Sequence, residues 1–120
     1  MDYTPHEVAE LLQNDGIQLI DIRQPEERDA GRIAGDRFIE LAQLAAQVES
    51  IDRERPVVFY CRSGSRSAMA TEAFRGAGFD AHNLLGGLLE WHAARRRTAS
   101  TRRRSRGSRR VGSRCGPRNG

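Results

Sequence analysis

Apolar and polar positions form blocks along the first 94 residues that predict strands and helices in turn. Short apolar runs predict strands at residues 17–22, 37–39, 57–60 and 79–83. Helical spacing and start or stop signals predict helices at residues 5–12, 25–30, 41–50 and 67–77. Strands that alternate with helices favour a parallel sheet. We therefore predict an α/β fold with about four to five parallel strands and helices on both faces.

The composition changes abruptly after residue 94. Residues 1–94 hold nine Arg and all sixteen Asp and Glu, a net charge of −7, whereas residues 95–120 hold eleven Arg and no acid. A segment of Arg, Ser, Gly and Thr cannot build a core. We predict one domain at residues 1–94 and an arginine-rich, disordered tail at 95–120. The tail is either a genuine basic extension or the product of a reading-frame error in a GC-rich gene.

The predicted tail has the charge of a segment that binds anions. Eleven arginines without acids would contact nucleic acid or acidic proteins electrostatically. The tail has no aromatic residues to stack on bases, so the contact would be non-specific.

Cys61 and Cys115 are the two cysteines of the chain. They form neither a disulfide framework nor a metal-ligand spacing, so we expect no metal, no cofactor and a reduced, cytoplasmic setting. The chain begins without the features of a signal peptide, and no apolar stretch approaches membrane-spanning length. We expect a cytoplasmic monomer that makes no membrane contact.

Cys61 follows the apolar run 57–60 and precedes a loop of Arg, Ser and Gly that leads into a predicted helix. This arrangement aims backbone N–H groups, a helix dipole and arginines at one sulfur. Such surroundings lower the pKa of a thiol and favour the reactive thiolate. The alternative is a small buried residue beside an ordinary turn.

Three motifs in order resemble the rhodanese family of sulfurtransferases in its small single-domain form, over residues 4 to about 92. They are Asp21-Ile22-Arg23 followed by Gly31-Arg32-Ile33-Ala34-Gly35, the loop Cys61-Arg62-Ser63-Gly64-Ser65-Arg66-Ser67, and Gly86-Gly87 with Trp91. Arg32, Ala34 and Asp36 stand where the family has His, Pro and Ala. These departures concern packing more than chemistry.

The resemblance implies a rhodanese-like fold and a transfer of sulfane sulfur through a Cys61 persulfide. The donor would be thiosulfate or a similar small anion, and the acceptor cyanide, a thiol or a protein. Arg62 and Arg66 would bind the anionic donor, while backbone N–H groups of the loop would hold the persulfide. The remaining loop residues in this substrate-binding set are Ser63, Gly64, Ser65 and Ser67.

Ser67 and Asp21 each have a second interpretation. Ser67 either donates a hydrogen bond to the sulfur or caps the following helix. Asp21 either orients loop or arginine groups at the sheet edge or forms a structural turn, and Arg23 is a second supporting residue beside it.

Two other functions compete with sulfur transfer. Cell-cycle protein-tyrosine phosphatases resemble rhodaneses, and a phosphatase or arsenate reductase is one alternative. Those phosphatases place one more residue between Cys and Arg than the four between Cys61 and Arg66. The other alternative is a rhodanese-like binding module with a nucleic-acid-binding basic tail, although such modules lack the cysteine that is present here.

Overall fold

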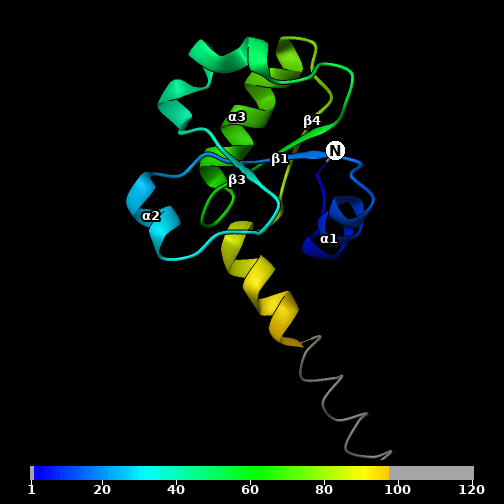
Figure 1. Ribbon diagram of the computed structural model, residues 1–120, viewed down its shortest axis with the longest axis vertical. Helices are drawn as coiled ribbons and strands as arrows, with labels where there is room; N and C mark the ends of the chain where they lie inside the picture. Colours follow the sequence, from blue (N-terminus) through cyan, green and yellow to red (C-terminus); the bar gives the residue numbers. More distant parts are fainter. Residues whose placement is uncertain (1, 98–120) are drawn as a thin grey trace, which may run out of the picture.

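Four parallel strands form the sheet of the computed structural model, which describes residues 2–97 (Figure 1). In the order β2-β1-β3-β4 they are β2 (Arg37–Phe38), β1 (Gln18–Asp21), β3 (Val57–Tyr60) and β4 (Ala81–Asn83). The register pairs Asp21 with Tyr60 and Phe59 with Asn83. The carboxyl ends of β1, β3 and β4 therefore meet at one edge, and the predicted α/β fold is confirmed with four strands.

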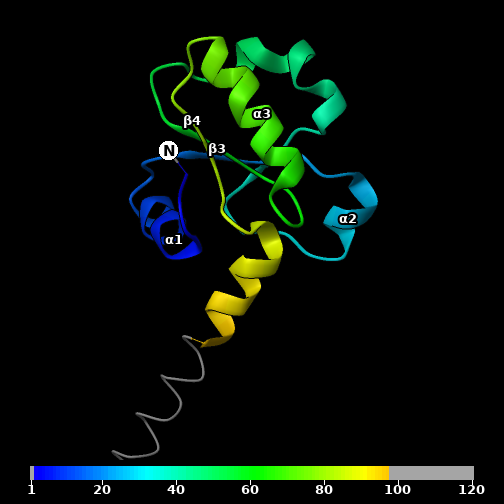
Figure 2. The ribbon, with the colours of Figure 1, turned by 180° about the vertical axis from the view of Figure 1, so that it is seen from behind.

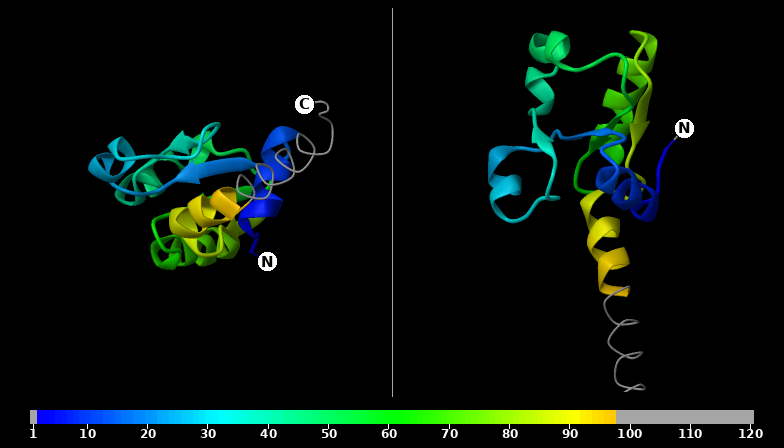
Figure 3. Two further views of the ribbon diagram at one scale, coloured as in Figure 1. Left: turned by 90° about the horizontal axis from the view of Figure 1, so that it is seen from below. Right: turned by 45° about the vertical axis from the view of Figure 1, so that its right-hand side comes forward.

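Helices cover both faces of this sheet. They are α1 (Pro5–Gln13), α2 (Pro25–Asp29), the 3-10 segments η1 (Leu41–Gln43) and η2 (Ala45–Ser50), α3 (Ser65–Gly76), and a helix at residues 87–97. In Figures 1 and 2, α3 and the 3-10 segments lie above the strands, whereas α1 and helix 87–97 lie below them. Figure 3 shows these groups from two further directions.

The two faces of the sheet build separate apolar clusters, because successive side chains of a strand point to opposite sides. Phe59 and Cys61 belong to one cluster, which includes Phe74 of α3. Val58 and Tyr60 belong to the other, with Val8 of α1 and the buried Trp91 of helix 87–97. The central strand β3 is buried along its whole length, so the position after it is fixed from both sides.

Segment 41–50 differs from the prediction, because two 3-10 segments replace one α-helix. Leu41 and Leu44 have a spacing of three, which is compatible with both helix types. Leu44 is buried in the first cluster, and Leu41 packs against it. The guanidinium of Arg37 also donates to the carbonyl of Ser50 at 3.0 Å and so holds the end of this segment.

Two predicted boundaries also move. α3 begins at Ser65, because Gly64 adopts a left-handed conformation with φ of 106° and caps the helix directly. β4 begins at Ala81 rather than at residue 79, because the backbone N–H of Phe79 still donates to the carbonyl of Phe74 at 3.0 Å.

Residues 95–97 continue helix 87–97. Arg97 pairs with Glu90 at 3.0 Å, and the Arg95 guanidinium lies 5.6 Å from the centre of the Trp91 ring. The predictions about the rest of the tail, Cys115 included, concern residues outside the described range. Within residues 2–97, every helix is too short or too polar to cross a membrane.

Candidate active site

Cys61 lies immediately after β3, where the chain turns back over the carboxyl edge of the sheet. Its sulfur accepts a hydrogen bond from the backbone N–H of Gly64 at 3.1 Å, and the hydroxyl oxygen of Ser67 lies 3.4 Å away. The residue is only 1% exposed. The loop from Cys61 to Ser67 therefore encloses the sulfur in a cup whose polar groups point inward.

The cup changes the pKa of the Cys61 thiol. Burial raises this pKa, but hydrogen bonds from the Ser67 hydroxyl and from the backbone N–H groups of Ser67, Gly64 and Arg66 together outweigh burial and lower it. These donors stabilise the anion because they bond to the charged form of the sulfur. A larger fraction of Cys61 is consequently thiolate at neutral pH than for an ordinary cysteine.

Arg66 reaches from the first turn of α3 to Glu27 in α2. Its two terminal nitrogens donate to the two carboxylate oxygens of Glu27 at 3.0 and 2.9 Å. The pair, with a further hydrogen bond from the backbone N–H of Gln24, lowers the pKa of Glu27 to about 2. Arg66 also interacts with Cys61, but its planar fork is occupied by the Glu27 carboxylate.

The remaining loop side chains point outward. Arg62, Ser63 and Ser65 are exposed, so the guanidinium of Arg62 is placed at the surface of the cup. The carbonyls of Cys61 and Arg62 instead point toward helix 87–97, where Cys61 O accepts from Leu88 N at 2.9 Å and Arg62 O from Leu89 N at 3.1 Å. Figure 2 shows the start of this helix next to the loop.

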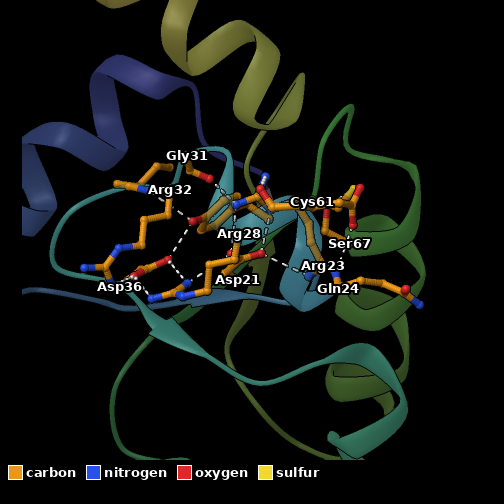
Figure 4. A network of polar contacts seen from close by, with 12 residues as sticks. Asp21, Arg23, Gln24, Arg28, Gly31, Arg32, Asp36, Cys61 and Ser67 are labelled. Atoms are coloured by element: carbon orange, nitrogen blue, oxygen red, sulfur yellow. Dashed lines mark hydrogen bonds and ion pairs between the residues drawn. The ribbon is translucent and has the colours of Figure 1, made fainter.

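Asp21 and Arg23 form a buried ion pair at the end of β1 (Figure 4). One carboxylate oxygen of Asp21 accepts hydrogen bonds from the Nε of Arg23 at 2.9 Å and from the backbone N–H of Arg23 at 3.0 Å. Arg23 in turn donates to the carbonyls of Gly31 and Glu27 at 2.6 and 3.3 Å. The pair ties α2 to the sheet and so supports Glu27, the partner of Arg66, without touching the sulfur.

A second carboxylate, Asp36, extends this network and was not among the predicted site residues. Its carboxylate accepts hydrogen bonds from both terminal nitrogens of Arg28 at 2.9 Å and from the hydroxyl of Tyr60 at 2.6 Å. Burial and the hydrogen bond to Asp36 raise the pKa of Tyr60. Arg32 lies 3.9 Å from the same carboxylate. The departures at positions 32 and 36 thus form an ion-pair network that connects α2 to β3.

Ser67 is not the helix cap, because Gly64 occupies that position and Ser67 is the third residue of α3. Its buried hydroxyl faces the sulfur and also the amide oxygen of Asn83, which is 2.5 Å away at the end of β4. Sequence reasoning missed Asn83. The available signal was its place as a polar residue at the end of a predicted strand, as for Asp21 and Cys61.

Known proteins share both this sequence pattern and this fold. A family model described as rhodanese-like domain matches residues 4–94. Thiosulfate sulfurtransferase GlpE of Pseudomonas aeruginosa is 34% identical over 90 residues, which cover 74% of this chain and 81% of that protein. The uncharacterized protein YqhL of Bacillus subtilis is 40% identical over 75 residues, and the match spans 62% of this chain and only 60% of YqhL.

The structure of the human single-domain sulfurtransferase TSTD1 is similar, with a TM-score of 0.69 and 29% identity over 77% of this chain and 95% of that one. The match to the family model over residues 4–94 covers every element that builds the cup, from β1 to the start of helix 87–97. The chain belongs to the rhodanese family, and its fold is the rhodanese fold.

Proposed function

We propose that the chain transfers a sulfane sulfur from thiosulfate or a similar small anion to a thiophilic acceptor through a persulfide on Cys61. The observation that carries this proposal is the cup around the sulfur, in which Gly64 N–H lies 3.1 Å and the Ser67 hydroxyl 3.4 Å from Sγ. Such donors favour an anion on sulfur both before and after it takes up a second sulfur atom. The similarity to a thiosulfate sulfurtransferase supports the choice of donor.

The reaction has two steps. The Cys61 thiolate attacks the outer sulfur of thiosulfate, a new S–S bond forms, and sulfite leaves with the electron pair of the old S–S bond. An acceptor such as cyanide or a thiolate then attacks the outer sulfur of the persulfide, and the Cys61 thiolate leaves with the electron pair of the persulfide S–S bond. Dividing the transfer in this way is nucleophilic catalysis with ping-pong kinetics.

The geometry favours this reaction over phosphoryl transfer. A phosphoryl group needs charge-assisted donors around three oxygens, and an arginine fork is the usual one. The Arg66 fork is bonded to Glu27 on both nitrogens. Cys61 is 1% exposed, so a single terminal sulfur atom fits the approach better than a bulky tetrahedral group.

The test is to load the purified protein with thiosulfate and to measure the intact mass and the digested peptides. We expect the peptide that contains Cys61 to gain one sulfur atom, and cyanide to remove this atom with the formation of thiocyanate. Release of phosphate from an aryl phosphate is measured in parallel. Absence of the added sulfur, together with Cys61-dependent phosphate release, would favour the phosphatase alternative.

We predict that Glu27 weakens the binding of the anionic donor because it neutralises Arg66. Glu27→Gln removes the negative charge and frees the guanidinium of Arg66 beside the cup. We expect the KM for thiosulfate to fall about threefold, with little change in kcat, since the interaction is partly exposed and screened. Steady-state kinetics at low and high salt would measure this effect, which should shrink as salt rises.

Glu26→Gln is the matched control for this prediction. It removes the same charge from the neighbouring, exposed position of α2, whereas the carboxylate that Arg66 contacts is that of Glu27. We expect a smaller change in KM for this variant. Equal effects of the two substitutions, or a rise in KM for Glu27→Gln, would contradict a specific action of Glu27 on Arg66.

A further inference from the structure

The Ser67 hydroxyl has one proton and three acceptors within reach. The amide oxygen of Asn83 lies 2.5 Å from Ser67 Oγ, the carbonyl of Gly64 3.2 Å and the Cys61 sulfur 3.4 Å. The carbonyl of Gly64 already accepts the backbone N–H of Ala68 at 3.0 Å. The competition for the proton is therefore mainly between Asn83 and Cys61.

The orientation of the Asn83 amide follows from its other contact. Its side-chain nitrogen donates to the carbonyl of Gly64 at 3.3 Å, so its oxygen faces Ser67. If the amide were reversed, its oxygen would face the carbonyl of Gly64, and two acceptors would meet. The residue is 6% exposed, and its backbone N–H is held by Asp2 at 3.1 Å. Asn83 thus presents a fixed acceptor to Ser67.

The two protonation states of Cys61 place different demands on this pair. In the thiol form the S–H donates to Ser67 Oγ, and Ser67 donates to Asn83, so each group has a partner. In the anionic form the sulfur is only an acceptor, and it keeps the Gly64 N–H. The Ser67 hydroxyl then either donates to the sulfur and leaves the Asn83 oxygen without its donor, or continues to donate to Asn83 and leaves the sulfur without this hydrogen bond. An unpaired buried acceptor is unfavourable.

We propose that Asn83 is a positioning residue, whose amide oxygen competes with the Cys61 sulfur for the proton of Ser67 and so limits the amount of reactive anion. The same competition applies to the persulfide, and this extension rests on the proposed function. No sulfur donor is needed to observe the effect on the free thiol.

The charged groups around Cys61 and Asn83 remain in place when Asn83 is changed to an uncharged residue. Arg66 of α3 interacts with Cys61, and its guanidinium is paired with Glu27 of α2. At the end of β1, Asp21 is paired with Arg23. The start of helix 87–97 brings Gly87 and Leu88, which carry no charge.

On the far side of Asn83, Asp2 is paired with Arg75 at 3.3 Å. A change in the titration of Cys61 in an uncharged variant at position 83 would therefore be transmitted through Ser67.

The experiment measures the rate of Cys61 alkylation by iodoacetamide against pH, without sulfur donor, in a Cys115→Ser background. It compares the parent protein, Asn83→Leu, Ser67→Ala and the double variant. We expect Asn83→Leu to lower the midpoint by about half to one pH unit, because Ser67 is free to donate to the sulfur. In the Ser67→Ala background the same substitution should leave the midpoint unchanged. An upward shift, or equal shifts in both backgrounds, would overturn the proposal.

Asn83→Asp provides the second test and is decisive if Asn83→Leu does not fold, as judged by circular dichroism. A carboxylate holds the Ser67 proton more tightly, so the midpoint should rise more when Ser67 is present than in the Ser67→Ala background, where only the added charge acts. Equal rises would overturn the proposal. A protein that shows the expected shifts but forms no persulfide with thiosulfate would contradict the proposed function alone.

Discussion

Replacement of Cys61 by serine is expected to lower the rate of thiocyanate formation from thiosulfate and cyanide by about a thousandfold or more. A hydroxyl has a far higher pKa than a thiol, and it cannot form the S–S bond that carries the transferred atom. The N–H of Gly64 and the Ser67 hydroxyl would still face the side chain at position 61, but that side chain would have no sulfur atom to form a persulfide. Initial rates measured at saturating donor would give the size of the loss.

Cys115→Ser is the control for this substitution, since it makes the same chemical change at the other cysteine of the chain. We expect the rate to remain within about twofold of the parent, because the reaction steps use only Cys61. Thermal unfolding should be similar for both variants, since serine is close to cysteine in size. Substantial turnover by Cys61→Ser would contradict the persulfide mechanism.

The sequence predicted those parts of the fold that depend on local pattern. The apolar run of β3, the loop after it and the helix α3 are contiguous, so their order already placed Cys61 at a strand end that faces a helix start. The parallel sheet followed from the alternation of strands and helices. The prediction of one α-helix at residues 41–50 was wrong, because the spacing of three between Leu41 and Leu44 is compatible with both helix types and two 3-10 segments form there.

The contacts around the sulfur were harder to predict because they join residues far apart in the chain. Glu27 and Arg66 are 39 positions apart, and Ser67 and Asn83 are 16 apart. Such pairs depend on the register of the strands and the packing of the helices. Asn83 was nevertheless within reach of sequence reasoning, since it ends a predicted strand at the edge where Cys61 lies.

The residues that depart from the family pattern also form contacts that the sequence did not predict. Arg32 and Asp36 are four residues apart, and from the sequence these departures concerned packing more than chemistry. In the structure the side chain of Asp36 is fully buried and accepts hydrogen bonds from Arg28 and Tyr60, while Arg32 lies near the same carboxylate. A buried carboxylate is tolerated here because several donors satisfy it. Arg28 and Tyr60 are 8 and 24 positions from Asp36, so no local pattern identifies them as its partners.

The contact between helix 87–97 and the loop gives the second large prediction, which concerns Gly87. Its φ is +61°, a conformation that favours glycine. A Cβ at this position would lie 2.5 Å from the carbonyl oxygen of Arg62 and 2.6 Å from that of Cys61. Both contacts are with backbone, so a side-chain rotation cannot relieve them.

We therefore expect Gly87→Ala to reduce the free energy of unfolding by about 3 kcal/mol, from the strained backbone and the overpacking together. Because the displaced carbonyls belong to the cup, sulfur transfer should fall even at temperatures where the variant is folded. Chemical denaturation and initial rates would measure the two effects. The control is Gly76→Ala at the end of α3, where a Cβ meets no atom within 4 Å. Since alanine favours a helix, this variant should unfold at the same denaturant concentration as the parent or a higher one, and equal behaviour of the two variants would contradict the assigned role of Gly87.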